Sequence, residues 1–411
     1  METSALVVVG STSVTPWGHD QLAKITEQAR ARGLRVVGID RADRLAGIGA
    51  TSGENDWYDE LLPADPDLAD ECGRVLAGRT DIAAIITIRE MSVEPVAVLA
   101  QAFGVRGNDP DAVHRIRNKD QCRQWLRERG FAQPSNALCS LRADAVAFVE
   151  RTAPGPWVVK PSDGMASIGV SLVRSTAELD AAIDRVGRDH FLVETYVTGQ
   201  EFSAEGVFIG EKPRVLALTR KLLNKGPGVV DGGFVETGHR QPCGLDAGAS
   251  SAASQAVESA LVAIGATHGI FHVEFWWTNE GVVLGELHVR GGGDFIHLLV
   301  EHTHPGVDMF GTLIDDLVGQ SSDVTTRQAG AAGATFFTMP EGTIRALHGW
   351  DEIIAHPNVV ASHLQVGVGD RVGAATGSYD RPGAIVVVGN TIDDVEQLTQ
   401  QLADQLIVDV S

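Results

Sequence analysis

The chain has 411 residues, of which 44% are hydrophobic, and its net charge is −21. Such a chain can bury large cores, divided between two or three domains. The negative charge argues against a nucleic-acid-binding protein and against a protein of anionic membrane surfaces, because both need basic patches.

The cysteines and the hydropathy of the chain further limit the class of protein. Cys72, Cys122, Cys139 and Cys243 are far apart and show no CxxC or metal-ligand spacing, so we interpret them as reduced thiols of a cytoplasmic protein. No run reaches the roughly 18 to 20 apolar residues of a membrane span. The N-terminal METSALVVVGSTS has no basic segment before its short apolar run and is not expected to be a signal peptide.

The N-terminal part alternates strands and helices. Residues 5–10 and 34–40 read as buried strands on either side of an amphipathic helix over residues 19–33. Residues 81–88 form another strand, and residues 94–104 a helix, which together predict a parallel, doubly wound sheet. The turn GSTSVTPWGHD lacks the GxGxxG pattern of a dinucleotide site, so this domain is expected to be a scaffold or one wall of a substrate cleft.

The pattern of the sequence changes near residue 110. A predicted helix ends at Gly130 with Lys119 near its start, and the segment PWVVKPSDGMASIGVSLV then reads as two strands joined by a loop rich in glycine and serine. Such a loop offers N–H groups and hydroxyls to an anion, and Lys160 beside it adds a positive charge. Taken alone, the segment is equally well a plain hairpin turn with a surface lysine. Lysine occurs at only six positions, however, which favours a specific role for Lys160.

The segment FLVETYVTGQEFSAEGVFIG follows. Glu194 ends one predicted strand and Glu201 begins the next, and main-chain groups between them could bind an adenine edge while Glu201 holds ribose hydroxyls. In isolation this pattern is weak, because glutamates at strand ends are more often solvated.

Residues 272–293, HVEFWWTNEGVVLGELHVRGGG, predict a hairpin whose turn spans Asn279–Gly281, with Gly281 in the left-handed conformation. The register pairs three positions on one face: Trp276 with Leu284, Glu274 with Glu286, and His272 with His288. Two facing carboxylates would repel each other by roughly 3 kcal/mol at about 5 Å and an effective dielectric constant of about 20. A compensating group between them is therefore required.

The order of these features resembles the ATP-grasp superfamily over nearly the whole chain. The resemblance is carried by Lys119 in RNKDQCRQWLRERG, Lys160 in WVVKP, the loop SDGMASIG, Glu201 in ETYVTGQE, Glu274 in HVEF and the string GELHVRGGGDFIHLL. It implies an ATP-grasp fold of mixed α/β and α+β class in three parts. These are a Rossmann-like pre-ATP-grasp domain (1–112), a central subdomain with a glycine-rich lid loop (113–202), and a C-terminal ATP-grasp domain with the metal and substrate site and a strand-rich tail (203–411).

The resemblance also implies the roles of individual residues. ATP would be bound by Lys119, Lys160, Ser162, Gly164, Ser167, Glu194, Thr195, Val197 and Glu201. Mg²⁺ would lie between Glu274 and Glu286, as the compensating group, because it prefers hard oxygen ligands. Arg290, Lys160 and Gly292 are the predicted catalytic residues, and Gly291–Gly293 would direct N–H groups at the attacked acyl group or, equally, simply turn the chain.

One position departs from the family pattern. Family members usually carry an asparagine two residues after the second metal glutamate, whereas this chain has His288. Imidazole is a poor Mg²⁺ ligand and suits Mn²⁺ or Zn²⁺ better. His288 could therefore favour Mn²⁺, leave one metal with an additional water, or hydrogen-bond Glu286 or the substrate.

Residues 218–242 contain FVETGHRQP, which resembles the branch of amino-acid ligases that form dipeptides. Arg220 and Lys221 could reach a phosphate or a substrate carboxylate, and His239 could face the acceptor amine or be an ordinary strand residue. The strand-rich tail resembles the C-terminal domain that these ligases share with purine-pathway ligases.

These features predict a cytoplasmic, ATP-dependent ligase that joins a small carboxylate, such as an amino acid, to an amine through an acyl phosphate, with release of ADP and phosphate. Two alternatives stay open. One is a purine-pathway ligase acting on a phosphoribosyl nucleotide, which would need a basic patch from residues such as Arg89, Arg115 and Arg117. The other is a nucleotide-binding protein without turnover. Neither a nucleic acid nor a membrane is expected as a partner, and a homodimer is consistent with the family.

Overall fold

The computed structural model describes residues 4–47, 57–164, 167–223, 234–320, 324, 327–375 and 377–411. Two stretches that entered the predictions lie outside the described residues. They are Met165 and Ala166 of the glycine-rich loop, and residues 224–233 of the segment 218–242.

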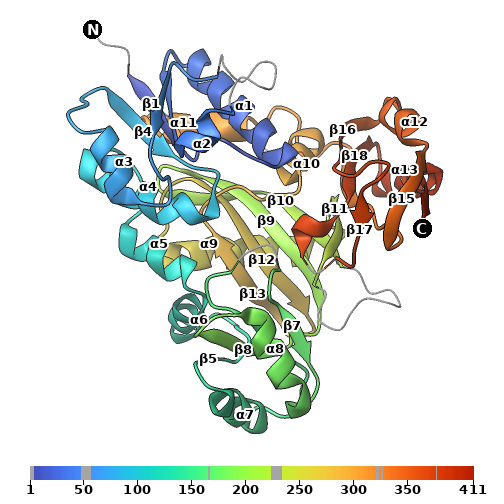
Figure 1. The fold of residues 1–411 in the computed structure, drawn as a ribbon. Coiled ribbons are helices and arrows are strands. Elements are labelled where there is room, and N and C mark those ends of the chain that lie inside the picture. Colours follow the sequence, from blue (N-terminus) through green and yellow to red (C-terminus); the bar gives the residue numbers. More distant parts are fainter. Residues whose placement is uncertain are drawn as a thin grey trace.

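The N-terminal part is a parallel sheet flanked by helices, as predicted (Figure 1). Its strands lie in the order β3-β2-β1-β4, and every pairing is parallel. The strands are β1 (Ala5–Val9), β2 (Arg35–Asp40), β3 (Glu60–Pro63) and β4 (Ile82–Ile86); the helices are α1 (Pro16–Ala31), α2 (Ala42–Leu45), α3 (Ala69–Val75) and α4 (Val93–Phe103). Helix α1 begins three residues earlier than predicted, because Thr15 caps it by accepting from the Gly18 N–H and Pro16 fits its first turn.

The central part is a small antiparallel sheet in the order β5-β8-β6-β7. Its elements are β5 (Asn136–Cys139), α7 (Arg142–Arg151), β6 (Trp157–Pro161), β7 (Ser171–Val173), α8 (Leu179–Val186) and β8 (Phe191–Thr195). The hairpin around the glycine-rich loop is confirmed by the pairing of Trp157 with Val173. The single helix predicted before it is two helices, α5 (Pro110–Arg117) and α6 (Lys119–Glu128), because Asn118 adopts an extended ψ of 99°.

The large C-terminal sheet has eight antiparallel strands in the order β13-β12-β9-β10-β11-β14-β18-β16. They are β9 (Gln200–Ile209), β10 (Lys212–Leu223), β11 (Glu236–Gln241), β12 (Ile270–Thr278), β13 (Gly281–His288), β14 (Ala331–Phe336), β16 (Val359–Leu364) and β18 (Gly383–Gly389). The helices of this part are α9 (Ala247–Ile264), α10 (Ile296–Thr303), α11 (Met309–Leu317), α12 (Trp350–Ile354) and α13 (Ile392–Gln405). A three-stranded sheet of β15 (Gly342–His348), β17 (Arg371–Val372) and β19 (Ile407–Val410) completes the tail, which is strand-rich as expected.

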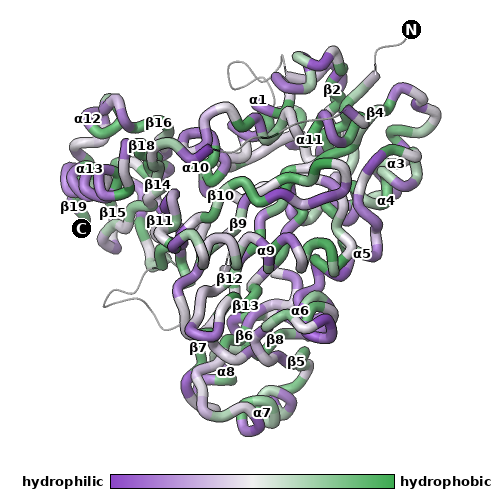
Figure 2. Tube along the Cα trace, turned by 180° about the vertical axis from the view of Figure 1, so that it is seen from behind, coloured by the Kyte–Doolittle hydropathy of each residue, from purple (hydrophilic) through white to green (hydrophobic). Residues whose placement is uncertain are grey.

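Hydrophobic residues hold these layers together. Phe202, Phe271 and Phe275 of the large sheet pack against Val257 and Leu261 of α9, and all five are at most 3% exposed. Figure 2 shows the complementary pattern at the surface, where the outer helix α13 is largely hydrophilic. Burial of one face of α9 therefore fixes this helix against the large sheet.

The hairpin of β12 and β13 differs from its predicted register. His272 does pair with His288, but Trp276 pairs with Val283, so the predicted partner Leu284 is wrong. The register shifts between Val273 and Phe275, where the strand opposite carries one extra residue. The extra residue fits because Gly285 has no side chain: a Cβ atom there would lie 2.8 Å from the Glu274 carbonyl oxygen. Gly281 has the predicted positive φ, 103°.

The predicted domain boundaries stay proposals. The first, between residues 112 and 113, falls inside α5, and the second, between residues 202 and 203, falls inside β9. Figure 1 shows the N-terminal and central parts on opposite sides of the large sheet, with the C-terminal tail beside it.

Candidate active site

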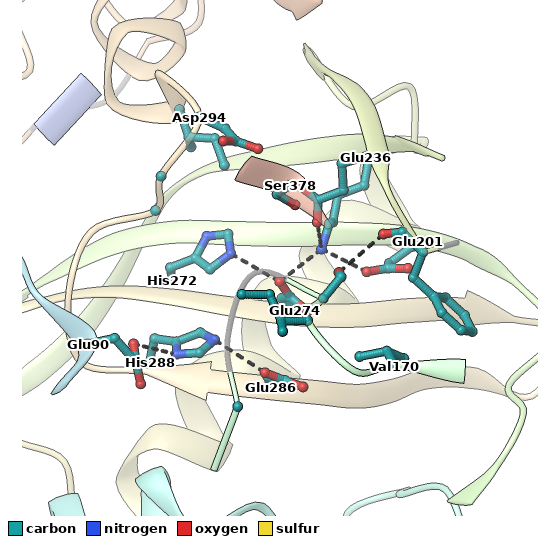
Figure 3. Close-up of a pocket in the computed structure, with 18 of the residues that line it drawn as sticks. Glu90, Val170, Glu201, Glu236, His272, Glu274, Glu286, His288, Asp294 and Ser378 are labelled. Carbon is teal, nitrogen blue, oxygen red and sulfur yellow. Dashed lines mark hydrogen bonds and ion pairs between the residues drawn. The ribbon is translucent and has the colours of Figure 1, made fainter. Parts of the chain in front are cut away.

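A cavity of about 650 Å³ lies where all three parts of the molecule meet. Its lining includes Trp17, Arg89 and Glu90 from the N-terminal part, Lys160 from the central part, and residues of β9 to β13 from the large sheet. Figure 3 shows the carboxylates of this cavity gathered beside two imidazoles. A cavity of this size and polarity at a domain junction is typical of a small-molecule site.

Two lysines from separate elements converge on Glu286. Lys119, the first residue of α6, lies 3.2 Å from one carboxylate oxygen, and Lys160, on β6, lies 3.3 Å from the other. Burial alone would raise the pKa of Glu286, but the charges of the two lysines lower it to about 2. Lys119 Nζ also donates to the carbonyl oxygen of Gly164, which ties it to the glycine-rich loop. Both lysines that are predicted to bind phosphate therefore point toward the Glu286 carboxylate.

The segment between Glu194 and Glu201, which we call the hinge and which is predicted to bind adenine, lines the cavity, but several of its polar groups already have hydrogen-bond partners within the protein. The Glu194 carboxylate is 4% exposed and is held by the Arg123 guanidinium and by Lys160 Nζ at 3.0 Å. The N–H groups of Thr195 and Tyr196 donate to the carbonyl oxygens of Ser135 and Pro156. Glu194 is thus a buried ion-pair partner, and recognition of an adenine edge here would depend on Val197 and on carbonyl groups.

Lys221 joins three carboxylates on neighbouring strands. Its Nζ lies 2.8 Å from Glu201, 2.6 Å from Glu236 and 2.8 Å from Glu274, and its side chain is only 3% exposed. Burial would lower the pKa of Lys221, but the three carboxylates raise it well above its ordinary value. Burial, together with the charges of Glu274 and Glu236, raises the pKa of Glu201 despite Lys221. One ammonium is therefore shared by three acids.

Two stacked histidines, His272 and His288, lie beside the predicted metal ligands Glu274 and Glu286, with ring centroids 5.8 Å apart. His272 Nδ1 lies 2.9 Å from Glu205, and its Nε2 lies 3.5 Å from Glu274. Against the effect of burial, Glu205 raises the pKa of His272 to about 9. Burial lowers the pKa of His288, whose Nδ1 lies 2.9 Å from Glu90. At neutral pH, His272 is therefore charged and His288 neutral.

The bond to Glu90 also sets the tautomer of His288. Glu90 is ionised, because His288 and Arg290 lower its pKa well below its ordinary value although burial would raise it. An ionised carboxylate only accepts hydrogen bonds, so the His288 proton lies on Nδ1. Nε2 then carries no proton, so its lone pair is available to a metal ion. This nitrogen lies 3.8 Å from Glu286 Oε2. A histidine oriented by a carboxylate in this manner is typical of metal ligands.

The Glu90 carboxylate accepts hydrogen bonds from three residues beside the cavity. Besides His288, it accepts from Arg290 Nε at 2.6 Å and from Arg117 Nη1 at 2.7 Å. Arg290 also donates to the Gly291 carbonyl oxygen at 2.8 Å. The predicted catalytic arginine is thus fixed at the start of the glycine turn.

The turn Gly291–Gly293 packs tightly against the site. A Cβ atom on Gly292 would lie 3.0 Å from His272 Nδ1, so this position requires glycine for close approach. Gln21 Nε2 donates to the Gly292 carbonyl oxygen at 2.9 Å. The two residues that follow, Asp294 and Phe295, have positive φ values of 57° and 62°.

His239 lies between two acids. Its Nε2 is 3.1 Å from Asp294 and 3.3 Å from Glu236, and these hydrogen bonds raise its pKa although burial would lower it. Asp294 is further held by both terminal nitrogens of Arg381. Burial would raise the pKa of Asp294, but Arg381 and His239 lower it strongly.

Most of the predicted site residues line this one cavity: Lys119, Lys160, Gly164, Ser167, Glu194, Thr195, Val197, Glu201, His239, Glu274, Glu286, His288, Arg290, Gly291 and Gly292. Two predicted residues do not belong to its lining. Ser162 uses its carbonyl oxygen to accept from the Lys119 N–H, and Arg220 pairs with Glu396. Neighbouring residues of a strand point to opposite faces, so Lys221 enters the cavity and Arg220 leaves it.

The predicted metal trio of Glu274, Glu286 and His288 is not preassembled. In the described part of the chain, two sets of potential ligands lie within 4.8 Å of one another: Glu236, His239 and Asp294, and Glu201, Glu236 and Glu274. Glu286 is turned instead toward Lys119 and Lys160.

Sequence reasoning did not select Glu90, Glu236, Asp294 or Arg381. Glu90 had a usable signal, since it follows the carboxyl end of a parallel strand, where ligands bind in such sheets. Arg381 had none, because it is distant in sequence from its partner Asp294 and only the fold brings them together.

Comparisons with known proteins agree with this architecture. A family model for the ATP-grasp domain matches residues 153–297, and a model described as L-amino acid ligase C-terminal domain 2 matches residues 335–411. The crystal structure of an L-amino acid ligase from Bacillus licheniformis superposes with a TM-score of 0.80 at 21% identity, with 100% of each chain covered, and confirms the predicted fold.

Two relatives extend the comparison. The uncharacterized protein y4rH of Sinorhizobium fredii is 28% identical over 336 residues, covering 79% of this chain and 68% of that protein. The alanine–anticapsin ligase of Bacillus subtilis is 24% identical over 225 residues, which is 48% of this chain and 46% of the ligase. The chain therefore matches less than half the length of that ligase. No helix in the described ranges combines the length and apolar character needed to cross a membrane.

Proposed function

We propose, from the premise that this chain belongs to the ATP-grasp ligases that form C–N bonds, that it joins the carboxylate of an amino acid or a related small acid to an amine at the expense of ATP. The observation that carries the proposal is the convergence of Lys119 and Lys160 on Glu286, beside Glu274 and Arg290, in one cavity. Alternating cations and carboxylates of this kind suit the binding of phosphates and a divalent cation together.

The donor set fits Mg²⁺. Glu274 and Glu286 both have lowered pKa values, so each presents an ionised, hard oxygen ligand at neutral pH. His288 Nε2 would add a softer ligand that Mn²⁺ accepts more readily. Bound metal would neutralise charge on the phosphates. The lysines now paired with Glu286 would then be available to the phosphate oxygens.

The remaining nucleotide contacts follow from the lining of the cavity. Val197 and the carbonyl groups of the hinge would read the adenine edge, and Glu201 would hold the ribose hydroxyls. Lys221 keeps Glu201 in place at 2.8 Å. The described residues of the loop around 162–169 would close over the phosphates and exclude water.

The proposed reaction has two steps. A carboxylate oxygen of the first substrate attacks the γ-phosphorus of ATP, which forms an acyl phosphate and releases ADP. The amine of the second substrate then attacks the acyl carbon, which forms the amide and releases phosphate and a proton. Arg290 would neutralise charge on the transferring phosphoryl group, and N–H groups of the Gly291–Gly293 turn would face the acyl oxyanion.

The surroundings of His239 offer acceptors to an amino group. The carboxylates of Glu236 and Asp294 lie 3.3 and 3.1 Å from His239 Nε2, and they are also paired with Lys221 and Arg381. An ammonium group of an amino-acid substrate would donate to an oxygen of either carboxylate. The name of the alanine–anticapsin ligase gives an amino acid, alanine, as one of the two molecules that it joins, and amino acids are the substrate class we propose for this chain.

The alternative phosphoribosyl substrate finds less support. Of the three arginines it would need, Arg89 lines the cavity, whereas Arg117 is paired with Glu90 and Arg115 stacks on Trp125. A protein without turnover would have little use for both metal glutamates and Arg290 in one cavity.

The test is ADP and phosphate release with Mg²⁺ and ATP across a panel of amino acids, singly and in pairs. Turnover that needs one acid and one amine, and that disappears in Lys160→Ala, is the expected result. The matched control is Lys212→Ala, since Lys212 is exposed and outside the cavity. ATP binding without turnover across the panel would refute the proposed substrate class.

A further inference from the structure

A short segment of the C-terminal tail reaches the cavity. Ser378, Tyr379 and Arg381 line it, and they lie within or directly after the 3₁₀ helix Ser378–Asp380. Arg381 Nη1 donates to the Glu236 carbonyl oxygen at 3.4 Å, and Ser378 is among the lining residues labelled in Figure 3, which places the tail at the wall of the site. This segment lies inside the region that matches the L-amino acid ligase C-terminal domain, residues 335–411.

The Arg381 side chain is held in place by several contacts. It is 4% exposed, and its Cζ atom lies 3.5 Å from the centroid of the Phe336 ring. Nε donates to the Ser378 carbonyl oxygen at 2.6 Å, which leaves the terminal nitrogens for Asp294. They reach its two oxygens at 2.8 and 2.6 Å. Paired hydrogen bonds of this type fix orientation as well as distance, and lysine cannot reproduce them.

Asp294 is also where the backbone is strained. Asp294 and Phe295 both have positive φ, which is a strained conformation for non-glycine residues and persists only where the surroundings enforce it. They directly follow the Gly291–Gly293 turn, whose middle glycine packs on His272. A contact that fixes Asp294 therefore also fixes the direction in which the turn presents its N–H groups.

We propose that Arg381 is a positioning residue through which the C-terminal domain sets the conformation of the Gly291–Gly293 turn, by way of Asp294. The inference rests on the proposed ligase activity, in which this turn faces the reacting acyl group. In this role Arg381 acts through Asp294 and not on the substrate. Its loss displaces the turn, and a misplacement of about 1 Å at a reacting centre lowers the rate on the order of 100-fold.

The first experiment is a double-variant cycle on kcat with the substrate pair found for the wild-type protein. Arg381→Ala and Asp294→Asn each lower kcat, and the KM for ATP stays within about twofold. Arg381→Lys recovers only part of the loss. The double variant is no more than about threefold slower than the slower single variant, because both changes break one link. Arg345→Ala, an exposed arginine of the same domain, is the control and leaves kcat unchanged.

The proposal would be overturned if the double variant lowered kcat by the product of the two single-variant factors, since Arg381 would then act independently of Asp294. Full recovery of kcat by Arg381→Lys would overturn it too, because charge alone would suffice. A crystal structure of Arg381→Ala gives a readout that does not depend on turnover. Asp294 and Phe295 leave the left-handed region if the proposal holds, and an unchanged turn refutes it even if the ligase activity itself is not found.

Discussion

The raised pKa of His272 gives a prediction that can be worked through quantitatively. Glu205 is 2% exposed and lies 2.9 Å from His272 Nδ1, and it raises the pKa of that imidazole from its ordinary value of 6.5 to about 9. Replacing Glu205 by the isosteric glutamine removes the charge. Glu274 lies 3.5 Å from Nε2 and still raises the pKa of His272 in the variant, so we expect His272 of Glu205→Gln to titrate well below the wild-type value of about 9.

The rise in the pKa of His272 from 6.5 to about 9 corresponds to about 3 kcal/mol in the free energy of unfolding, at roughly 1.4 kcal/mol per pH unit. A group whose folded-state pKa is raised stabilises the fold fully below its unfolded pKa, and the stabilisation is lost as the pH rises through the folded value. The difference in stability between wild type and Glu205→Gln is therefore at most about 3 kcal/mol, is largest below pH 6.5, and is lost as the pH rises through 9.

The assay is an NMR titration of histidine ¹³Cε1 resonances in metal-free protein, together with denaturant unfolding at pH 6.5 and 9.5. Glu280→Gln, at the exposed tip of the same hairpin, is the control and leaves the His272 titration unchanged. A wild-type His272 that titrates near 6.5, or a Glu205→Gln variant that still titrates near 9, would refute the assignment of the charge to this pair.

Four further predictions concern the charged groups of the cavity. Lys160→Ala lowers kcat by about 100-fold or more while the circular dichroism spectrum stays that of the wild type, and retained turnover would remove Lys160 from the phosphate site. Glu286→Gln raises the Mg²⁺ concentration needed for half-maximal rate by at least about tenfold, and an unchanged Mg²⁺ titration would exclude it as a ligand. His288→Asn raises the ratio of activity with Mg²⁺ to activity with Mn²⁺, whereas an equal ratio would make His288 a bystander. Lys221→Met removes the ammonium that Glu201, Glu236 and Glu274 share and destabilises the protein by up to about 3–5 kcal/mol at pH 7, as thermal unfolding can show, with a smaller loss at acidic pH; equal losses at both pH values would argue against ion pairing as the cause.

The sequence was informative wherever chemistry and local pattern coincide. The parallel N-terminal sheet followed from buried strands alternating with helices, and Lys119, Lys160, Glu274 and Glu286 followed from their order along the chain. The structure brings those four residues to one cavity. Period-two patterning also predicted the hairpin that carries the two glutamates.

What the sequence could not provide depends on contacts between distant segments. The bulge at Gly285 arises from close approach of the Glu274 backbone, which shifts the register without any change in the alternation that predicted it. Arg220 and Lys221 were equivalent candidates until the pairing of β10 decided which faces the cavity. The link between Arg381 and Asp294 depends on the packing of the tail against the large sheet.

The central claim is that a substrate carboxylate is activated by direct transfer of phosphate, and isotope transfer tests it most directly. The substrate acid is labelled with ¹⁸O in its carboxylate, and the phosphate released during ligation is analysed by mass spectrometry. The proposed reaction predicts one ¹⁸O atom in each phosphate formed, together with ADP and the amide. Amide formation with unlabelled phosphate, or with the label in AMP, would contradict an acyl phosphate and with it the mechanism proposed for this site.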